Sequence, residues 1–490
     1  MSTPRELLVN LQAGVKGLAS RGVLRALAEP AAARGVTVYL VGGSVRELAL
    51  GKASPDLDLA VSGATLELAR DLAQALDGTF VLLDEAEATA RVVTRGEVLD
   101  LAQFRAPTLE GDLQGRDFTI NALALELDAV LGGGAPTLID PWGGLNDLAQ
   151  GLIRVLAPEN LRDDPLRLLR AYRFAATLGF SLTPETTAAI RRFVPEFPRV
   201  AGERVHQELF LLLAAPRAAG ALNEMDRAGL LRQIFPELED LKGVEQDGYH
   251  HLDVFRHSLE TVGQLEEVLA RPGDFFRALA REVGPYAARP GKAALLKIAA
   301  LFHDAGKPQV QERRTDPERY TFYYHEKVGL EIFTGAALRL RMSQAEVKTV
   351  ATLMMLHMRP FLLMPAFRRG ELTLRALGRL VRAARPELAG LFALAMGDSL
   401  AGQGPQKPAD SEEVLAELAD AAYGFLKERL EPLEREPRLL TGDDLIEVLG
   451  LAPGPRFREF LTAVQEAQWE GQVKTRDEAL GLVRRLLAMG

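Results

Sequence analysis

Two aspartates separated by a single residue, Asp56 and Asp58, restrict the fold of this chain more than any other feature of its sequence. They open a short apolar run that predicts a strand through Val61, so both carboxylates point to one face of a sheet. Like charges this close repel each other, and a bound divalent cation is the usual way to balance them. Mg²⁺ suits such a pair because it prefers oxygen ligands and completes its shell with water and phosphate oxygens.

Two glycines and an arginine precede the aspartates and extend this interpretation. The run Val36–Val41 predicts a strand that ends at Gly42 and Gly43. Ser44 can then cap a short helix that holds Arg46. Glycine leaves backbone N–H groups open to phosphate oxygens, and a guanidinium adds a charge-assisted contact. A glycine-rich turn with two solvated aspartates is the better account of a D-x-D pair alone, but the whole set at this spacing favours a phosphate and metal site.

The pattern over residues 31–128 predicts a small mixed α/β sheet domain. A helix is expected over 66–76, and strands over 91–94 and 98–104 form a hairpin. From Leu161 onward nearly every segment has helical period, with leucine, alanine and arginine dominating. We therefore predict an α+β fold, in which a small mixed-sheet head is followed by all-α domains.

The stretch LVGGSVRELALGKASPDLDLAVSG resembles the catalytic motif of the class II nucleotidyltransferases, the family that contains bacterial CCA-adding tRNA nucleotidyltransferases and bacterial poly(A) polymerases. By that resemblance Asp56 and Asp58 are catalytic and hold Mg²⁺ for a two-metal, in-line attack of an RNA 3′-hydroxyl on an α-phosphate. The glycines and the arginine before them would bind the nucleotide. The family usually has aspartate where this chain has Glu47, which keeps the charge and weakens Glu47 alone as a site residue.

Two further segments resemble elements of the same family. Arg116–Ala122 is similar to R-R-D-F-T-I-N-A, with Gly115 in place of the first arginine. The resemblance implies that Arg116 and Asp117 contact the ribose and phosphates of the nucleotide. Asp140–Leu148 resembles the hinge between head and neck, and a simple Asp-Pro turn before a Gly-Gly helix entry is compatible with that role.

A long helix is expected to begin near Arg162, with Asp164 and Arg167 on one face near its start. Taken alone, this pattern is equally well an acid in a first helical turn with a surface ion pair. It resembles the family element E-D-x-x-R, with Asp163 replacing the glutamate, which implies that Asp164 and Arg167 act as a protein template. A carboxylate accepts from the exocyclic amine of cytosine or adenine, while a guanidinium donates to acceptors beside it. Arg170 completes the expected nucleotide-binding residues.

Six of the seven histidines lie between His250 and His357, a range too narrow to dismiss. Imidazole nitrogens with carboxylate oxygens form a common ligand set for first-row transition metals. The order of these residues resembles the HD phosphohydrolase superfamily, in which one divalent ion of unidentified metal would bind His257, His303, Asp304 and Asp398, with His325 and His357 completing a second. His251 is a weaker candidate. A relic site whose histidines serve only for packing is the alternative.

Length and composition set the remaining expectations. At 490 residues the chain exceeds one core, and we divide it into a nucleotidyltransferase head (1–145), a helical neck with the base-reading helix (146–240), an HD domain (241–405) and a helical RNA-seating tail (406–490). Gly402–Pro408 is the best linker candidate. The absence of cysteine excludes disulfides and thiolate metal sites. Without a signal peptide or an apolar stretch of about 18 residues, we expect a cytoplasmic protein with no membrane partner.

Together these features predict a template-independent nucleotidyltransferase that adds C, A or both to the tRNA 3′ end, using CTP, ATP or both. Residues 106–115 form only a short link between two head elements, whereas family members that complete CCA usually have a longer flexible loop there. This favours a CC-adding enzyme. A full CCA-adding enzyme, a poly(A) polymerase and an inactive RNA- or nucleotide-binding relative are the alternatives, and the oligomeric state is left open.

Overall fold

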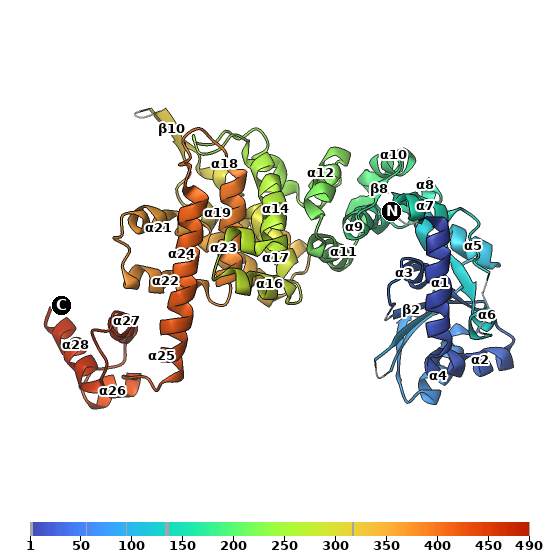
Figure 1. Cartoon of the computed structure of the whole chain (residues 1–490), viewed down its shortest axis with the longest axis horizontal. Helices are drawn as coiled ribbons and strands as arrows, with labels where there is room; N and C mark the ends of the chain where they lie inside the picture. The colour runs from blue at the N-terminus through green and yellow to red at the C-terminus, as the bar shows by residue number, and fades with distance from the viewer. Residues whose placement is uncertain (1–2, 55, 95, 133–136, 316–317, 490) are drawn as a thin grey trace. The chain divides into compact units, whose positions relative to one another are not determined.

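The computed structural model describes residues 3–54, 56–94, 96–132, 137–315 and 318–489 (Figure 1). By packing, these residues form two compact units. The first runs to Leu212 and includes Glu224–Gln233, and the second contains Leu213–Asn223 and Ile234–Gly490. The finer division into head, neck, HD domain and tail stays a prediction.

A mixed sheet of six strands forms the centre of the first unit within the described residues, in the order β3-β4-β5-β2-β1-β6. Its strands are β1 (Val38–Val41), β2 (Asp56–Val61), β3 (Thr79–Asp84), β4 (Thr89–Val93), β5 (Val98–Gln103) and β6 (Ala124–Glu126). β2 and β5 pair in parallel and the other neighbours are antiparallel. The expected strands are confirmed, including the β4–β5 hairpin, whose turn residue Arg95 lies outside the described residues.

Successive side chains of β2 point alternately to the core of the head and to the candidate site. Leu57 and Leu59 are buried in the core of the head, so Asp56 and Asp58 occupy the opposite face. Helix α4 (Thr65–Ala75) packs against β3, β4 and β5 through its buried Leu68 and Leu72. The strand thus holds both aspartates on a supported, rigid element.

Short helices surround the sheet and continue into the neck. They are α1 (Pro4–Ala19), α2 (Gly22–Arg34), α3 (Gly42–Ala49), α5 (Leu109–Gln114), the 3₁₀ turn Thr119–Asn121, α6 (Leu127–Leu131), α7 (Gly144–Gln150), α8 (Pro158–Asp163), α9 (Leu166–Leu178), α10 (Pro184–Phe193) and the 3₁₀ turn Val194–Arg199. A two-residue ladder joins β7 (Leu152–Ile153) to β8 (Ser181–Leu182). Helices α11 (Gly202–Ala214), α12 (Ala218–Ala228) and α13 (Leu231–Ile234) contribute residues to both units.

The second unit is mainly helical, as expected. It contains the 3₁₀ turn Pro236–Leu241, α14 (Val254–Ala270), α15 (Pro272–Phe275), α16 (Ala280–Ala288), α17 (Lys292–Phe302), α18 (Lys307–Val310), α19 (His325–Arg339), α20 (Gln344–Leu356), α21 (Met358–Arg368), α22 (Leu374–Ala384), α23 (Leu388–Ala401), α24 (Ser411–Phe425), a π-helical turn (Leu426–Leu430), α25 (Glu431–Arg435), α26 (Gly442–Glu447), α27 (Arg456–Trp469) and α28 (Arg476–Met489). Helix α23 is almost wholly buried and packs along α14. An antiparallel hairpin of β9 (Glu312–Thr315) and β10 (Glu318–Thr321) departs from the all-α expectation.

The segment Gly402–Pro408 does not behave as a free linker, so that interpretation was wrong. Gly404 N–H donates to Tyr249 O at 2.7 Å, and Gln406 N–H donates to Gly248 O at 2.9 Å. A side chain at Gly404 would lie 2.3 Å from the Gly248 oxygen, so glycine is needed for this close approach. The glycines that suggested flexibility in the sequence instead permit two backbone segments to dock.

The tail has a core of its own. Its buried apolar side chains come from the last three helices and the segments that flank them, and include Leu445, Phe460, Val464 and Val483. The segment also packs on the rest of the second unit, because α27 contacts α22 and Arg379 pairs with Glu466.

One run of residues also overturns the expectation that no apolar stretch approaches the length of a membrane span. Within the described residues, Gln344–Arg368 is long and apolar enough to cross a membrane by length and composition alone. This run consists of α20 and α21, and it carries buried Thr349 and His357 on its inward side. Buried core helices pass the same test, so length and composition say little here.

Candidate functional site

A pocket of about 500 Å³ opens in the first unit beside β2 and β5. All eight expected nucleotide-binding residues line it, and Asp58 joins them from β2. Its charged lining consists of Arg46, Arg105, Arg116, Arg167, Arg170, Arg173 and Arg204 with Asp58, Asp100, Asp112, Asp117 and Asp164. Such a wall can neutralise a polyphosphate, and most of its carboxylates pair with arginines, such as Asp117 with Arg170 and Asp112 with Arg116.

Gly42 and Gly43 lie where a phosphate or a metal ion would come close to the backbone. Gly42 has a positive φ of 63°, a left-handed backbone that glycine tolerates best. A side chain at Gly42 would lie 2.9 Å from an Arg116 nitrogen, and one at Gly43 would lie 2.9 Å from an Asp58 oxygen. Any larger residue at either position would therefore disturb Arg116 or Asp58.

Asp58 has a carboxylate neighbour on the adjacent parallel strand. The register of β2 and β5 pairs Asp58 with Asp100. Burial and the negative charge of Asp100 raise the pKa of Asp58. Arg91 balances Asp100 from β4 through bonds of 2.7 and 2.8 Å. Asp56 begins the strand, is exposed, and lies on the same face. Oxygen ligands with this surplus of negative charge fit a Mg²⁺ ion.

A buried polar network supports the opposite side of the pocket. Arg46 donates to the side chain of Asn121, whose amide donates to Asp117 at 2.8 Å. Arg170 Nε donates to the other Asp117 oxygen at 2.9 Å. Burial alone would raise the pKa of Asp117, but the charge of Arg170 and these hydrogen bonds lower it to about 2. Asp117 is therefore an anion at neutral pH that fixes Arg170. Glu208 continues the network by pairing with Arg170 at 3.3 Å.

The expected long helix through Asp164 does not form. Helix α8 ends at Asp163, Pro165 interrupts the chain, and α9 begins at Leu166, so Asp164 lies in an extended junction. Proline disfavours helical geometry in the residue before it, which explains the break. Asp164 and Arg167 nevertheless line the same pocket.

Both residues of this pair are held from several directions. Arg204 Nη2 donates to Asp164 at 2.9 Å. Arg167 Nη1 donates to the carbonyls of Gly115 at 2.9 Å and Asn160 at 3.2 Å. Asp164 Oδ1 accepts from the backbone N–H of Leu166 at 3.3 Å, which leaves this oxygen one further lone pair for a base edge, and the guanidinium of Arg167 keeps further donors.

The second unit gathers the histidines and aspartates of five helices. Asp304 lies at their centre. Its Oδ2 is 3.2 Å from His303 Nε2 and 3.9 Å from His257 Nε2. Its Oδ1 is 3.3 Å from His325 Nε2 and 3.8 Å from His357 Nε2. The two oxygens thus face two ligand groups, as a carboxylate shared between two ions would.

Asp398 and Lys307 complete the surroundings of Asp304. Asp398 Oδ1 lies 2.9 Å from His257 Nε2, which closes the first ligand group. Lys307 Nζ lies 2.6 Å from Asp304 Oδ2 and donates to Gln246 at 2.6 Å. A cationic group therefore already touches the oxygen that would face the first ion.

The ring orientations fit a metal centre. The Nδ1 atoms of His303, His325 and His357 each meet the backbone carbonyl three residues earlier, at 2.9, 2.8 and 2.6 Å. These contacts direct the Nε2 atoms inward, and His325 and His357 face each other there at 3.1 Å. Two lone pairs cannot share that distance without a proton or a cation between them.

The electrostatics of the cluster agree with this fit. Burial lowers the pKa of His357 to about 3, and the neighbouring histidines add to that shift, so its imidazole is neutral at pH 7. Burial would also lower the pKa of His303, but Asp304 and Asp398 outweigh it and raise the value to about 9. The positive charges of His303 and Lys307 thus balance those of Asp304 and Asp398, and a bound divalent cation would take the place of the His303 proton.

Comparison with known proteins identifies three regions of the chain. The poly A polymerase head domain matches residues 38–154, the probable RNA and SrmB-binding site of polymerase A matches 179–242, and the HD domain matches 254–421. The A-adding tRNA nucleotidyltransferase of Deinococcus radiodurans is 38% identical over 91% of this chain and 94% of its own length. The CC-adding tRNA nucleotidyltransferase of Thermus thermophilus is 36% identical over 90% of this chain and 92% of its own.

The chain belongs to the tRNA nucleotidyltransferase family. The fold agrees, because the CCA-adding enzyme of Thermotoga maritima, solved with tRNA, aligns over 94% of each chain with a TM-score of 0.60 at 22% identity. A nucleotidyltransferase domain and an HD domain both imply bound divalent metals. The His/Asp groups described above offer nitrogen and oxygen ligands that could hold such metals.

Several residues of this family member's pockets were missed by the sequence analysis. In the head these are Asp100, Arg105, Asp112, Arg173 and Arg204. Asp100 carried no detectable signal in the sequence, because only the parallel register of β2 and β5 places it beside Asp58. Near the HD cluster, His250 was passed over for His251, yet His250 is the one close to His257 and Asp398. Adjacent residues in a loop carry no periodicity that could have separated them.

Proposed function

We propose that the head transfers nucleotides from CTP to the 3′ end of tRNA and stops after two additions. The observation that carries this proposal is one pocket that contains both the Asp58 region and the pair Asp164 and Arg167. A metal-type carboxylate site beside a base-edge donor and acceptor is what nucleotide selection without a nucleic-acid template requires.

In this proposal each side chain has a distinct task. Asp56 and Asp58 would hold Mg²⁺, which supplies charge neutralisation at the triphosphate and a more acidic 3′-hydroxyl. The Gly42 and Gly43 backbone, with Arg46 and Arg116, receives the phosphates. The 3′-hydroxyl of the RNA releases its proton to solvent and its oxygen forms a bond to the α-phosphorus. The bond between that phosphorus and the oxygen bridging to the β-phosphorus breaks, and pyrophosphate leaves with the electron pair.

Base selection follows from donors and acceptors. One Asp164 oxygen accepts from the exocyclic amine that cytosine and adenine share, and Arg167 donates to the neighbouring ring acceptors. Uracil and guanine offer the opposite pattern at these atoms and are disfavoured. The negative charges of Asp117 and Asp164 attract the Arg167 guanidinium, against repulsion from Arg105 and Arg170.

The stop after two additions rests on the link between β5 and Arg116. Residues 109–114 of this link form α5, Leu113 is buried, and Asp112 accepts from Arg105 N–H at 3.1 Å. Asn160 ties the end of α5 to the neck by donating to Gln114 O at 2.8 Å and Arg116 O at 2.7 Å. A packed and tethered link resists the movement needed to reshape the pocket from CTP to ATP.

A second candidate is addition of the terminal A alone, because the relative that is 38% identical bears the name of an A-adding enzyme. Transcripts of tRNA that end before CCA, after C and after CC, each supplied with CTP or ATP separately, distinguish the candidates. CC addition to the first transcript with no A addition to the third supports the proposal. Efficient A addition to the third contradicts it, and ATP-only extension of unrelated RNA would identify a poly(A) polymerase.

We also propose that the HD cluster is a metal-dependent phosphomonoesterase or phosphodiesterase for nucleotides or RNA ends, for example a 2′,3′-cyclic phosphate. His257, His303, Asp304 and Asp398 would hold one transition-metal ion, and His325 and His357 a second with Asp304. Such an ion supplies an ionised water near neutral pH and offsets charge on the phosphate. Hydrolysis of 2′,3′-cyclic AMP and p-nitrophenyl phosphate with nickel, manganese or cobalt is the test, and absence of both metal and hydrolysis contradicts it.

Partners and location complete the proposal. Its macromolecular partner is the tRNA 3′ end, which suits relatives named for tRNA and a fold seen with tRNA. A chain without cysteine whose substrates are tRNA and CTP is expected to work in the cytoplasm.

A further inference from the structure

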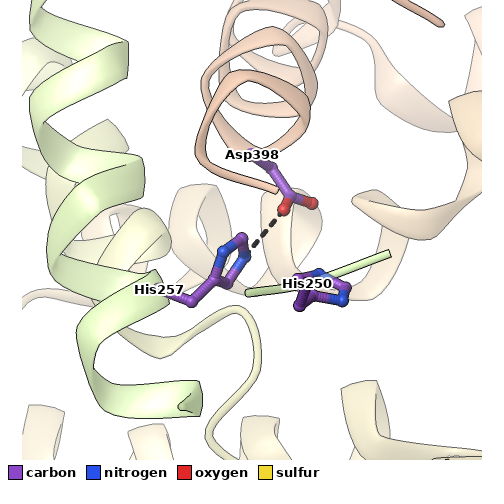
Figure 2. A group of neighbouring side chains, drawn as sticks. All are labelled: His250, His257 and Asp398. Atoms are coloured by element: carbon purple, nitrogen blue, oxygen red, sulfur yellow. Dashed lines mark hydrogen bonds and ion pairs between the residues drawn. The ribbon is translucent and has the colours of Figure 1, made fainter. Parts of the chain in front are cut away.

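His250 lies at the solvent-facing end of the HD cluster, close to one side of the expected ligands. Ligand atoms of His250, His257 and Asp398 all lie within 4.8 Å of one another. Figure 2 shows the three side chains approaching from the segment before α14, from α14 and from α23. The His250 and His257 rings meet edge to face with centroids 4.6 Å apart. Neither the HD resemblance nor the sequence pattern assigned a role to His250.

A carboxylate outside the cluster holds the His250 ring. Asp247 Oδ1 lies 2.8 Å from His250 Nδ1. With Nδ1 donating to a carboxylate, the free lone pair is on Nε2, which is the tautomer that a metal-ligating histidine needs. Carboxylate–histidine pairs of this kind are a recurrent support of metal ligands, because they fix the ring and make it more basic.

The backbone around His250 is also fixed. Gly248 and Tyr249 accept the hydrogen bonds of Gln406 and Gly404 described above, and these two residues follow the helix that carries Asp398. A side chain at Gly404 would lie 2.4 Å from the His250 nitrogen. This backbone clamp, made by residues 248–249 and 404–406, positions His250 relative to Asp398.

His257, the buried neighbour of His250, has a ring nitrogen that is not used in a hydrogen bond with any described residue. His257 is fully buried, and within the described part of the chain its Nδ1 has no hydrogen-bond partner. His251 differs in every respect: it is exposed, and its Nδ1 accepts from the backbone of Gln403 at 3.3 Å. His250 therefore lies against the ligand cluster, whereas His251 contacts the backbone at Gln403.

We propose that His250, oriented by Asp247, is a further metal ligand that binds a divalent transition-metal ion together with His257 and Asp398. This inference rests on the proposed metal centre of the HD domain. Two imidazole nitrogens and a carboxylate oxygen suit first-row ions such as Ni²⁺, Co²⁺ or Mn²⁺. The His250 side chain is 16% exposed whereas that of His257 is 0% exposed, so His250 forms the more exposed side of this ligand set.

Metal binding by the full-length protein tests the proposal directly. Chelator-treated wild type and the variants His250→Ala, Asp247→Asn and His251→Ala are titrated with CoCl₂ by calorimetry and by visible absorption, and metal content is measured after dialysis. We expect His250→Ala to lose an ion or to bind it at least about tenfold more weakly, with altered Co²⁺ absorption. Asp247→Asn should weaken binding about 10- to 100-fold, the range for a lost supporting carboxylate. His251→Ala should match the wild type.

The outcomes separate this inference from the proposed function. If the wild type binds Co²⁺ and His250→Ala binds it with the same stoichiometry, affinity and absorption, His250 is not a ligand, while the metal centre stands. If the wild type binds no metal, the centre and the inference both fail. Circular dichroism and thermal melting of each variant verify folding, and Asp247→Asn keeps the test valid if His250→Ala does not fold.

Discussion

The folded head disfavours the charge on Asp58, because burial and Asp100 raise the pKa of this carboxyl. A carboxyl whose pKa is higher in the folded than in the unfolded chain costs stability once the pH exceeds its unfolded pKa. The ionised Asp58 carboxylate therefore lowers the stability of the fold, as expected where a cation and a substrate depend on its charge.

Asp58→Asn removes that charge at nearly constant volume. We expect nucleotide addition to fall by at least about 100-fold, since electrostatic stabilisation worth several kcal/mol is lost. The variant should melt no lower than the wild type without Mg²⁺, and it should lose the Mg²⁺-dependent rise in melting temperature. Activity assays and thermal melts with and without MgCl₂ measure this. Asp128→Asn, an exposed carboxylate of α6, is the matched control. Near-normal turnover of Asp58→Asn would refute the Mg²⁺ assignment.

Arg167→Ala should lose discrimination as well as rate. A good bidentate contact to a base is worth about 1–3 kcal/mol, or roughly 5- to 150-fold between right and wrong bases. The ratio of kcat/KM for CTP to that for UTP is the measurement. Arg162→Ala, which removes an exposed arginine of α8 paired only with its neighbour Asp163, is the control. Unchanged exclusion of UTP and GTP by Arg167→Ala would contradict the template role.

Asp117 contributes an acid-dependent part of the stability of the head. Its pKa is about 2 in the folded protein against the ordinary 3.8 of an aspartate, so it stabilises the fold above pH 4 and loses this effect as the pH falls toward 2. Between pH 5 and pH 3 the loss amounts to about 1 kcal/mol. Urea unfolding of the head at these two pH values should therefore show a smaller pH effect in Asp117→Asn than in the wild type. An equal pH effect in both proteins would mean that Asp117 is not paired.

At the level of elements, the link to Arg116 and the neck meet at Asn160. Its side chain satisfies two carbonyls at the end of α5, each hydrogen bond worth about 0.5–1.5 kcal/mol. Asn160→Ala should loosen the link and lower the preference for CTP over ATP, with some A added to tRNA ending in CC. Steady-state kinetics with both nucleotides measure it, with the exposed Asn146→Ala of α7 as control. Unchanged preference would show that the link does not limit specificity.

The sequence predicted elements well where one local pattern decides them. Alternation identified β2 and the β4–β5 hairpin. The expected Ser44 cap was wrong, because α3 already begins at Gly42 and the Ser44 hydroxyl bonds to the backbone of Asp56 and Asp58 instead. The sequence did not predict that α5 fills the link, because the packing of Leu113 depends on residues distant along the chain. It also extended α9 backward through Asp164, although Pro165 was a visible signal against helix at that position.

The residues of the candidate sites likewise fall into those that a local pattern predicts and those that depend on distant parts of the chain. Residues within a recognisable motif, such as Asp58 and Asp304, were found directly. Residues contributed by a neighbouring strand or a loop, such as Asp100 and His250, were not, because only the register of β5 and the docking of the loop bring them close. Pairing between segments is a three-dimensional property that a single sequence does not display.

For the whole molecule, the two candidate sites belong to different compact units. A substitution at one site should therefore leave the activity of the other site intact. Asp304→Ala should abolish metal binding and phosphate-ester hydrolysis in the HD domain while nucleotide addition stays within about twofold of wild type. Asp58→Asn should do the reverse. Both activities are assayed on each purified variant, and loss of both activities in either one would mean that the sites are coupled.

The backbone clamp gives the HD domain a mechanical property. Two hydrogen bonds join the backbone at Gly248 and Tyr249 to the backbone at Gln406 and Gly404. The residues between these two points, which include the histidines and aspartates of the cluster, therefore form a closed loop, and a displacement of one of its ends is passed directly to the other.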